Sequence, residues 1–479
     1  MNESIQKTLL RVRPPRVHIS YDIETEGAII SKELPCIIGV IGDFTGLRQD
    51  QFQNYNQRQF IFIDNDNFND VLKSCCAAVE INLTTIKSTV ILKFNTMDDF
   101  NPLNIIKQIE PLYKLFQIKS DLQDLNIRVM NNVKILDIVK DINNNKTFKI
   151  DEVGIKSPEH KKILQDLLNN FQTQLKEYPK SKNDNPVLTI QNIISILDNI
   201  LSDSLNIILH DNVFKQLESS WRGLLYLIKN LNISTSLKVR IFNCSLDEIY
   251  QDINNALEFD QSIMFKKLYE DEYGTYGGNP FSVLGLNFYM DKDNKHFEFI
   301  NKFVDIISCA HLPTVMGMSA NMLNIDDFTH INEPRDISKI FDTQEFIKYK
   351  SFRAKEYSRY MSFVLPSFMG RAPYGPNGIV IEGLNYNEKI DNHNDFLWIN
   401  SIFAFLQRVG DAFEKYNWFS AIVGPETGGM VPNLPTYLYK TPNGDKVIKC
   451  PTESAITDRR ERELSQQGII SLCYSKDSD

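Results

Sequence analysis

The run from Cys36 to Gly42, Cys-Ile-Ile-Gly-Val-Ile-Gly, constrains the fold more than any other segment of the chain. It contains no charged side chain and is closed by the turn Asp43–Gly46, so it predicts a strand that is buried on both faces. Strands of this kind occur in sheets that are covered on both sides. We therefore expect this strand to share a core with segments from elsewhere in the chain.

The N-terminal segment is basic and then alternates in polarity. Residues 1–16 carry Lys7, Arg11, Arg13 and Arg16 against Glu3, and Pro14-Pro15 disfavours a helix, which predicts an extended basic arm. The next residues alternate with a period of two, as a half-buried strand does. Its apolar face has Val17, Ile19, Tyr21 and Ile23, and its polar face has His18, Ser20 and Asp22. A strand near a terminus can add to the sheet edge of a neighbouring subunit.

Helical and strand-like segments alternate along the rest of the chain, which is typical of an α/β fold. The polar segment Glu177–Pro186 carries two prolines and predicts a linker, with a domain boundary near residue 180. Further strands are expected at 60–63, 89–94, 238–244, 282–288 and 361–366, and helices at 102–125, 163–171, 190–205, 214–228, 299–309 and 395–414.

Composition narrows the class of protein. The 52 Lys and Arg residues against 61 Asp and Glu residues give a net charge of −9, which argues against a nucleic-acid partner. We expect no membrane insertion, because no long uninterrupted apolar run is present. The seven cysteines have no C-x-x-C spacing, which indicates reduced thiols in a cytoplasm and no metal site.

A search for catalytic motifs finds no P-loop, no G-x-S-x-G and no H-E-x-x-H, so we expect no catalytic residues and no cofactor. Two glycine-rich loops, Gly274–Pro280 and Gly424–Gly429, could present N–H groups to an anion or could simply permit tight turns. Arg459, Arg460, Glu461 and Glu463 lie at helical spacing and predict either a self-paired helix face or a contact face.

Ordered segments of the first region resemble the small subunit (TssB) of the type VI secretion contractile sheath. They are Arg11–Glu24, Lys32–Pro35, Gly42–Gly46, Phe62–Phe68 and Leu92–Pro102. Later segments resemble the large sheath subunit (TssC). They are Leu217–Gly223, Tyr273–Pro280, Arg371–Pro376, Gly424–Gly429, Leu434–Thr436, Pro451–Arg460 and Gly468–Ile470. The resemblance divides the chain into a TssB-like region (1–175), a linker (176–190) and a TssC-like region (191–479).

The resemblance implies a phage tail-sheath-like α/β fold with an extended N-terminal arm and strand, in a cytoplasmic, non-enzymatic bacterial protein. Such a protein polymerises into a helical sheath around an Hcp-like inner tube on a baseplate, and contracts to propel the tube into a target cell. A ClpV-like AAA+ ATPase recycles the contracted sheath. The resemblance also implies that the strand Val17–Ile23 joins the sheet of a neighbouring subunit.

Two features depart from the family pattern. The two subunits are normally separate chains, whereas here they are joined, which raises the effective concentration of two halves that must pair. The TssC-like match stops soon after Tyr474, and the leading segment that the ATPase recognises is missing or replaced by the linker. Three alternatives therefore stay open: a sheath subunit, a sheath-related fragment or accessory that needs a separate chain, and an anion- or nucleotide-binding module that uses the Gly424–Gly429 loop.

Overall fold

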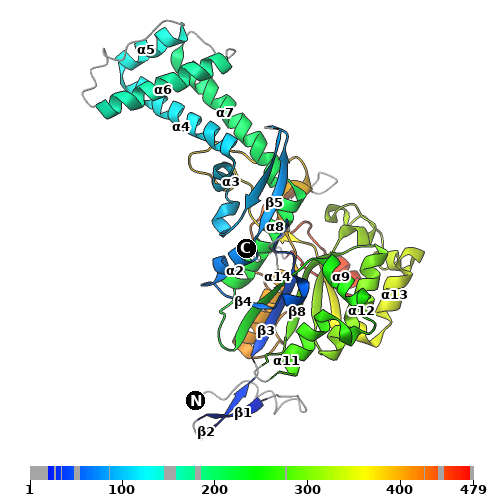
Figure 1. Cartoon of the computed structure of the whole chain (residues 1–479). Helices are drawn as coiled ribbons and strands as arrows, with labels where there is room; N and C mark the ends of the chain where they lie inside the picture. The colour runs from blue at the N-terminus through cyan, green and yellow to red at the C-terminus, as the bar shows by residue number, and fades with distance from the viewer. Residues whose placement is uncertain are drawn as a thin grey trace.

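The computed structural model describes residues 20–25, 28–33, 35–47, 54–85, 87–144, 158–178, 185–275, 278–424, 427–440 and 447–474. An α/β body forms the middle of the molecule, a helical bundle projects from one end of it, and a small N-terminal hairpin projects from the other (Figure 1).

A seven-stranded sheet is the centre of the body. Its strands, in spatial order, are β15 (Ile469–Ser471), β10 (Met361–Leu365), β9 (Thr314–Met318), β8 (Val283–Met290), β3 (Cys36–Gly42), β7 (Leu237–Asn243) and β4 (Ile61–Ile63). The first six run parallel, and β4 closes one edge antiparallel to β7. This arrangement confirms the expected α/β class.

The central position of β3 joins the two regions of the chain. Both neighbours of β3, namely β7 and β8, come from the second region, and β3 pairs with β7 along its whole length. Every residue of β3 is buried. Ile38 and Val40 belong to the core on one face of the sheet, while Ile37 and Ile41 belong to the core on the other. The expectation that the two regions share a core is therefore confirmed.

Two-stranded ladders surround the main sheet. They are β1 (Ser20–Thr25) with β2 (Ala28–Glu33), β5 (Ala78–Leu83) with β6 (Ser88–Lys93), β11 (Phe368–Met369) with β12 (Trp398–Ile399), and β13 (Tyr437–Lys440) with β14 (Val447–Cys450). All four pairs are antiparallel.

Helices cover both faces of the sheet. The core on one face includes residues of α2 (Phe68–Ser74), α3 (Pro102–Gln108), α8 (Asn212–Lys229) and α14 (Ile402–Tyr416). The core on the other includes residues of α9 (Leu246–Asn255), α10 (Ile263–Phe265), α12 (Asn294–Cys309), α13 (Ile347–Arg353) and α15 (Asp458–Ser465). The short helix α11 (Asp271–Tyr273) lies beside the start of β3.

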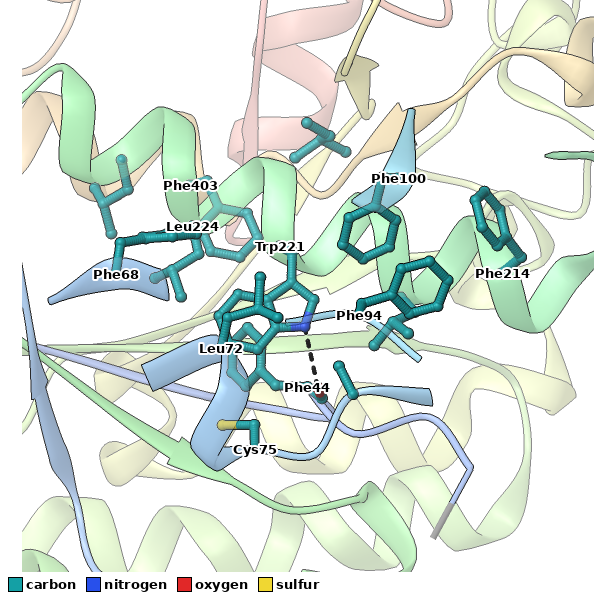
Figure 2. Packing of buried hydrophobic residues seen from close by; sticks show 14 of the residues in the cluster. Phe44, Phe68, Leu72, Cys75, Phe94, Phe100, Phe214, Trp221, Leu224 and Phe403 are labelled. Atoms are coloured by element: carbon teal, nitrogen blue, oxygen red, sulfur yellow. Dashed lines mark hydrogen bonds between the residues drawn. The ribbon is translucent and has the colours of Figure 1, made fainter. Parts of the chain in front are cut away.

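Trp221 on α8 is the largest side chain that is fully buried, and it bonds the two regions directly. Its Nε1–H donates to the carbonyl oxygen of Phe44 at 3.0 Å, and its ring meets the rings of Phe44 and Phe68 edge-on, with centroids 5.2 and 5.7 Å away. Figure 2 shows these aromatic rings gathered around the indole. Two residues further along α8, Gly223 lets the ring of Phe403 on α14 pack against the helix backbone, since a Cβ at this position would lie 2.4 Å from that ring.

The projecting bundle consists of α4 (Glu110–Asn131), α5 (Val133–Asn143), α6 (Pro158–Glu177) and α7 (Pro186–Leu209), which share a separate apolar core. The helix expected at 102–125 is split, since Ile109 has extended backbone between α3 and α4 and Pro111 lies in the first turn of α4. The segment 178–185 separates α6 from α7 inside the expected linker. The division into regions stays a prediction.

Helix α7 ties the bundle to the body. In the described part of the chain it alone has the length and composition of a membrane-crossing helix. Its residues Ile190, Ile193 and Leu197 are nevertheless buried in the bundle core, and Leu201, Leu205 and Ile208 in the core of the body. The buried amino group of Lys119 on α4 lies 2.7 Å from Asp198 on α7 and donates to the carbonyl oxygen of Gly383. These contacts indicate a core helix.

We expect Trp221→Ala to lower the free energy of unfolding by about 3–5 kcal/mol, because it leaves a large cavity where the two regions meet. Trp221→Phe should lose less, about 1–3 kcal/mol, by leaving the carbonyl of Phe44 without its donor. Urea unfolding followed by circular dichroism measures both. Trp418→Ala is the control, since that indole is 38% exposed. Equal midpoints for Trp221→Ala and the control would contradict this account.

Candidate assembly interface

The N-terminal hairpin is the first candidate surface. Ser20, Tyr21, Asp22 and Ile23 of the expected interface strand lie in β1, and Val17, His18 and Ile19 lie outside the described residues. β1 pairs only with β2 among the described strands, with Ser20 opposite Glu33 and Thr25 opposite Ala28. The hairpin extends beyond the end of the main sheet (Figure 1), so its backbone edges are available for pairing with another chain.

The second candidate surface is helix α15. Two of its charged side chains, Arg460 and Glu463, form contacts within the chain. The side chain of Arg460 is 6% exposed; it lies 2.7 Å from Glu463 and donates to the carbonyl oxygens of Asn332 and Pro334. Glu463 also accepts the backbone N–H of Ile337 at 3.3 Å. Arg460 and Glu463 therefore hold the loop 332–337 against α15.

The other two charged residues predicted on this helix are more accessible. The side chain of Arg459 is 71% exposed, although it bonds Glu463 at 2.9 Å and the carbonyl of Arg335 at 2.8 Å. Glu461 is partly buried. A lattice contact through α15 stays a prediction, and of the four residues Arg459 offers the most surface for it.

The Gly424–Gly429 loop closes on itself. Gly429 donates its N–H to the carbonyl of Gly424 at 2.8 Å, and Gly428, with a φ of 90°, has its carbonyl bonded by Arg408 at 3.0 Å. Pro425 and Glu426 lie outside the described residues. In the other glycine-rich loop, the N–H of Gly278 bonds the carbonyl of Thr275 and the N–H of Asn279 bonds Glu272. The N–H groups of Gly278, Asn279 and Gly429 are thus bonded by nearby residues of the chain.

A buried ion cluster, which the sequence analysis did not predict, connects two of the TssC-like segments. Arg371 donates to Glu218 at 3.0 Å and to both oxygens of Glu388 at 2.7 and 3.1 Å, and its guanidinium lies 4.3 Å from the ring centre of Tyr374. All four residues are buried. The only sequence signal was that Glu218, Arg371 and Tyr374 lie within segments that resemble the family.

Burial opposes the charged form of Glu388, but His210, whose Nε2 lies 3.6 Å from Oε1, and Arg371 favour it and hold the pKa at about 2. This carboxylate therefore stays ionised at neutral pH and stabilises the fold down to strongly acidic conditions.

The pKa of the Glu453 carboxyl is shifted in the opposite direction. Burial raises the pKa of its carboxyl to about 7, although the backbone N–H of Ser367, which it accepts at 2.8 Å, lowers it. Ser367 lies two residues after the end of β10, and its backbone carbonyl in turn accepts the N–H of Glu453 at 3.0 Å. Across the described residues no group of three or more His, Cys, Asp or Glu side chains is placed to hold a metal ion.

Comparisons with known proteins match the two regions separately. A family model for the EvpB/VC_A0108 tail sheath N-terminal domain matches residues 191–479. A second model, described as type VI secretion system, VipA, VC_A0107 or Hcp2, matches residues 9–151.

Two proteins of Pseudomonas aeruginosa PAO1 are similar to the chain. The type VI secretion system sheath protein TssC1 is 36% identical over 61% of this chain and 60% of its own length. The sheath protein TssB1 is 33% identical over 26% of this chain and 74% of its own length. The chain thus spans about three fifths of the length of TssC1 and about three quarters of TssB1.

We expect Arg460→Ala to lower the free energy of unfolding by about 2–3 kcal/mol, because Glu463 and two backbone carbonyls lose a buried donor. Arg459→Ala, at an exposed ion pair, should cost under about 1 kcal/mol. Chemical unfolding of the two variants measures this difference. Similar losses in both would mean that α15 does not hold the loop as described.

Glu453→Gln should flatten the dependence of melting temperature on pH between 6 and 8. A carboxyl whose pKa is raised by folding binds its proton more tightly in the native state, so its contribution is present below pH 4.5 and is lost as the pH rises through 7. The native chain should therefore lose stability over this range by more than the variant does. Glu345→Gln, at a 66% exposed side chain, is the control. A slope unchanged by Glu453→Gln would disprove the titration.

Proposed function

Because the chain belongs to the type VI secretion sheath family, as a TssB-like region fused to a TssC-like N-terminal region, we propose that it polymerises around an inner tube and contracts to propel that tube into target cells. The families to which both regions belong are structural and non-enzymatic. The observation that carries the proposal is the position of β3, which unites the two subunit types in one core.

The arrangement supports a sheath subunit in a second respect. The body is built around a sheet whose central strand is buried on both faces, whereas the hairpin is outside that sheet. A rigid body with a protruding strand pair can add to the sheet of a neighbour without disturbing its own core. We assign this role to the strand Val17–Ile23 and propose self-assembly in a bacterial cytoplasm.

The inner-tube, baseplate and ATPase partners belong to the same proposal. An Hcp-like tube and a baseplate follow from the contractile role. The ATPase is the partner with the least support. In the TssC family a leading segment carries the helix that the ATPase recognises, and no segment of this chain was found to resemble it.

A second candidate is a sheath-related chain that needs a separate protein to complete its lattice. The observation that favours it is that the chain spans 60% of the length of TssC1. An anion-binding module has less support, because the described N–H groups of Gly278 and Gly429 are bonded within their own loops.

Negative-stain electron microscopy of the purified chain, alone and with its inner-tube protein, separates these candidates. Hollow tubules with a cogwheel cross-section are the expected result. Monodisperse particles under both conditions would contradict assembly by this chain alone and favour the second candidate.

Replacing Ile19 and Tyr21 with Asp should abolish tubules and leave the melting temperature of the monomer unchanged within about 2 °C. Both residues lie on the apolar face of the predicted strand, and a charge there opposes pairing with a neighbour. Ile91→Asp is a matched control on β6, where the side chain is 50% exposed. Equal loss of tubules and of monomer stability would place this strand in the monomer core instead.

A further inference from the structure

The edge strand β4 presents an uncovered surface. Ile61 and Phe62 are 37% and 38% exposed, although they lie on the main sheet. Beside Phe62 is an open cavity of about 490 Å³, which is also lined by Ile37, Lys238, Arg240 and Asn279. Arg240 is paired with Glu272 at 2.6 Å. Ile61 and Phe62 are adjacent in the strand, so they point to opposite faces of the sheet, and Phe62 is the one that lines the cavity. Exposed apolar side chains on both faces of an edge strand indicate a place where another segment packs.

Three carboxylates follow the strand. Asp64 and Asp66 lie in the turn after β4, and Asp70 lies in the first turn of α2. Oδ1 of Asp64 accepts the N–H groups of Asp66 and Asn67 at 3.0 and 2.9 Å, so the turn is held in one conformation. Within the described residues, none of the three carboxylates forms an ion pair. We call Ile61, Phe62, Asp64, Asp66 and Asp70 the β4 surface.

The occupant must be cationic and partly apolar, and the chain contains such a segment nearby. Residues 1–16 carry four cations and one carboxylate. Among them Arg11 and Arg13 alternate with Val12, which suits a surface that is both acidic and apolar.

The direction of the chain is compatible with docking of this arm on the β4 surface. β1 begins at Ser20, opposite Glu33, which lies three positions before the start of β3. Because β1 runs antiparallel to β2, which leads into β3, its first residue Ser20 lies at the end of the hairpin that is nearest to the main sheet (Figure 1). β4 ends toward that same side, since it runs antiparallel to β7 and its last residue, Ile63, is opposite Val239.

The distances are compatible with docking in the same chain. β3 and β4 are separated by one strand, a span of about 10 Å. Extended chain covers about 13 Å over the four residues between Arg16 and Ser20, and about 30 Å over the nine from Arg11. The tether to Ser20 also keeps the effective concentration of the arm high.

We propose that residues 1–16 dock on the β4 surface of their own chain, with Arg11 and Arg13 paired to the carboxylates of Asp66 and Asp70 and Val12 against Phe62. The docked arm covers the sheet edge and clamps the base of the hairpin, which sets the direction in which β1 and β2 leave the body. The proposal concerns the isolated chain, so it is tested separately from sheath assembly.

Disulfide trapping in the full chain tests the docking. Val12→Cys is combined with Asn65→Cys, an equimolar mixture of ¹⁴N- and ¹⁵N-labelled protein is oxidised, and the linked peptides are identified by mass. Linkage between positions 12 and 65 within single-isotope chains is the expected result. The matched control pairs Val12→Cys with Asn82→Cys on the exposed side of β5. Mixed-isotope linkage would mean that the arm docks on a second copy, and a yield no higher than the control would overturn docking altogether.

Charge reversal tests the recognition. Arg11→Glu with Arg13→Glu should lower the yield of the 12–65 linkage at least fivefold, and adding Asp66→Arg with Asp70→Arg should restore it. Asp64 is left unchanged because it caps the turn. An unchanged yield after reversal of the arm alone would overturn pairing through these charges, and unchanged melting temperatures verify that each variant is folded.

Discussion

The pairing of β3 with β7 and β8 is the interaction on which the rest of the structure depends. It inserts a strand from the first region between two strands from the second, and both faces of that strand are covered by side chains that come largely from the second region. The hydrogen bond from Trp221 to the carbonyl of Phe44 continues the same junction beyond the end of the strand. Neither region can bury these apolar surfaces alone, so a covalent connection between them increases the probability that they meet.

The helical bundle and the N-terminal hairpin project from the body that contains this shared core (Figure 1). The bundle has its own apolar core and is held to the body through α7 and the buried pair Lys119–Asp198. The hairpin contributes no strand to the main sheet. This division suits the proposed sheath role, in which contacts with neighbours change while the fold of each subunit does not.

The buried charges have a structural role that their sequence context does not reveal. Arg371 connects Glu218 on α8 to Glu388, and Arg460 holds the loop 332–337 against α15. Removing one partner from such a cluster would leave a buried charge unpaired, which is costly. In the segments that resemble the sheath family, Glu218, Arg371 and Arg460 therefore contribute to the fold of the chain itself.

The sequence by itself determined that Cys36–Gly42 is a doubly buried strand and that the fold is α/β, because apolar runs and their periodicity are local properties. A shared core was expected only indirectly, because a strand buried on both faces needs partners from elsewhere in the chain. Its motifs also identified both sheath families. Only the tertiary structure decided that β3 lies between β7 and β8, that Arg460 and Glu463 are used inside the chain, and that Arg371, Glu218 and Glu388 form one cluster. Strand order and ion pairing depend on contacts between residues that are distant in the chain, and no local pattern records which distant partner a strand or a charge will meet.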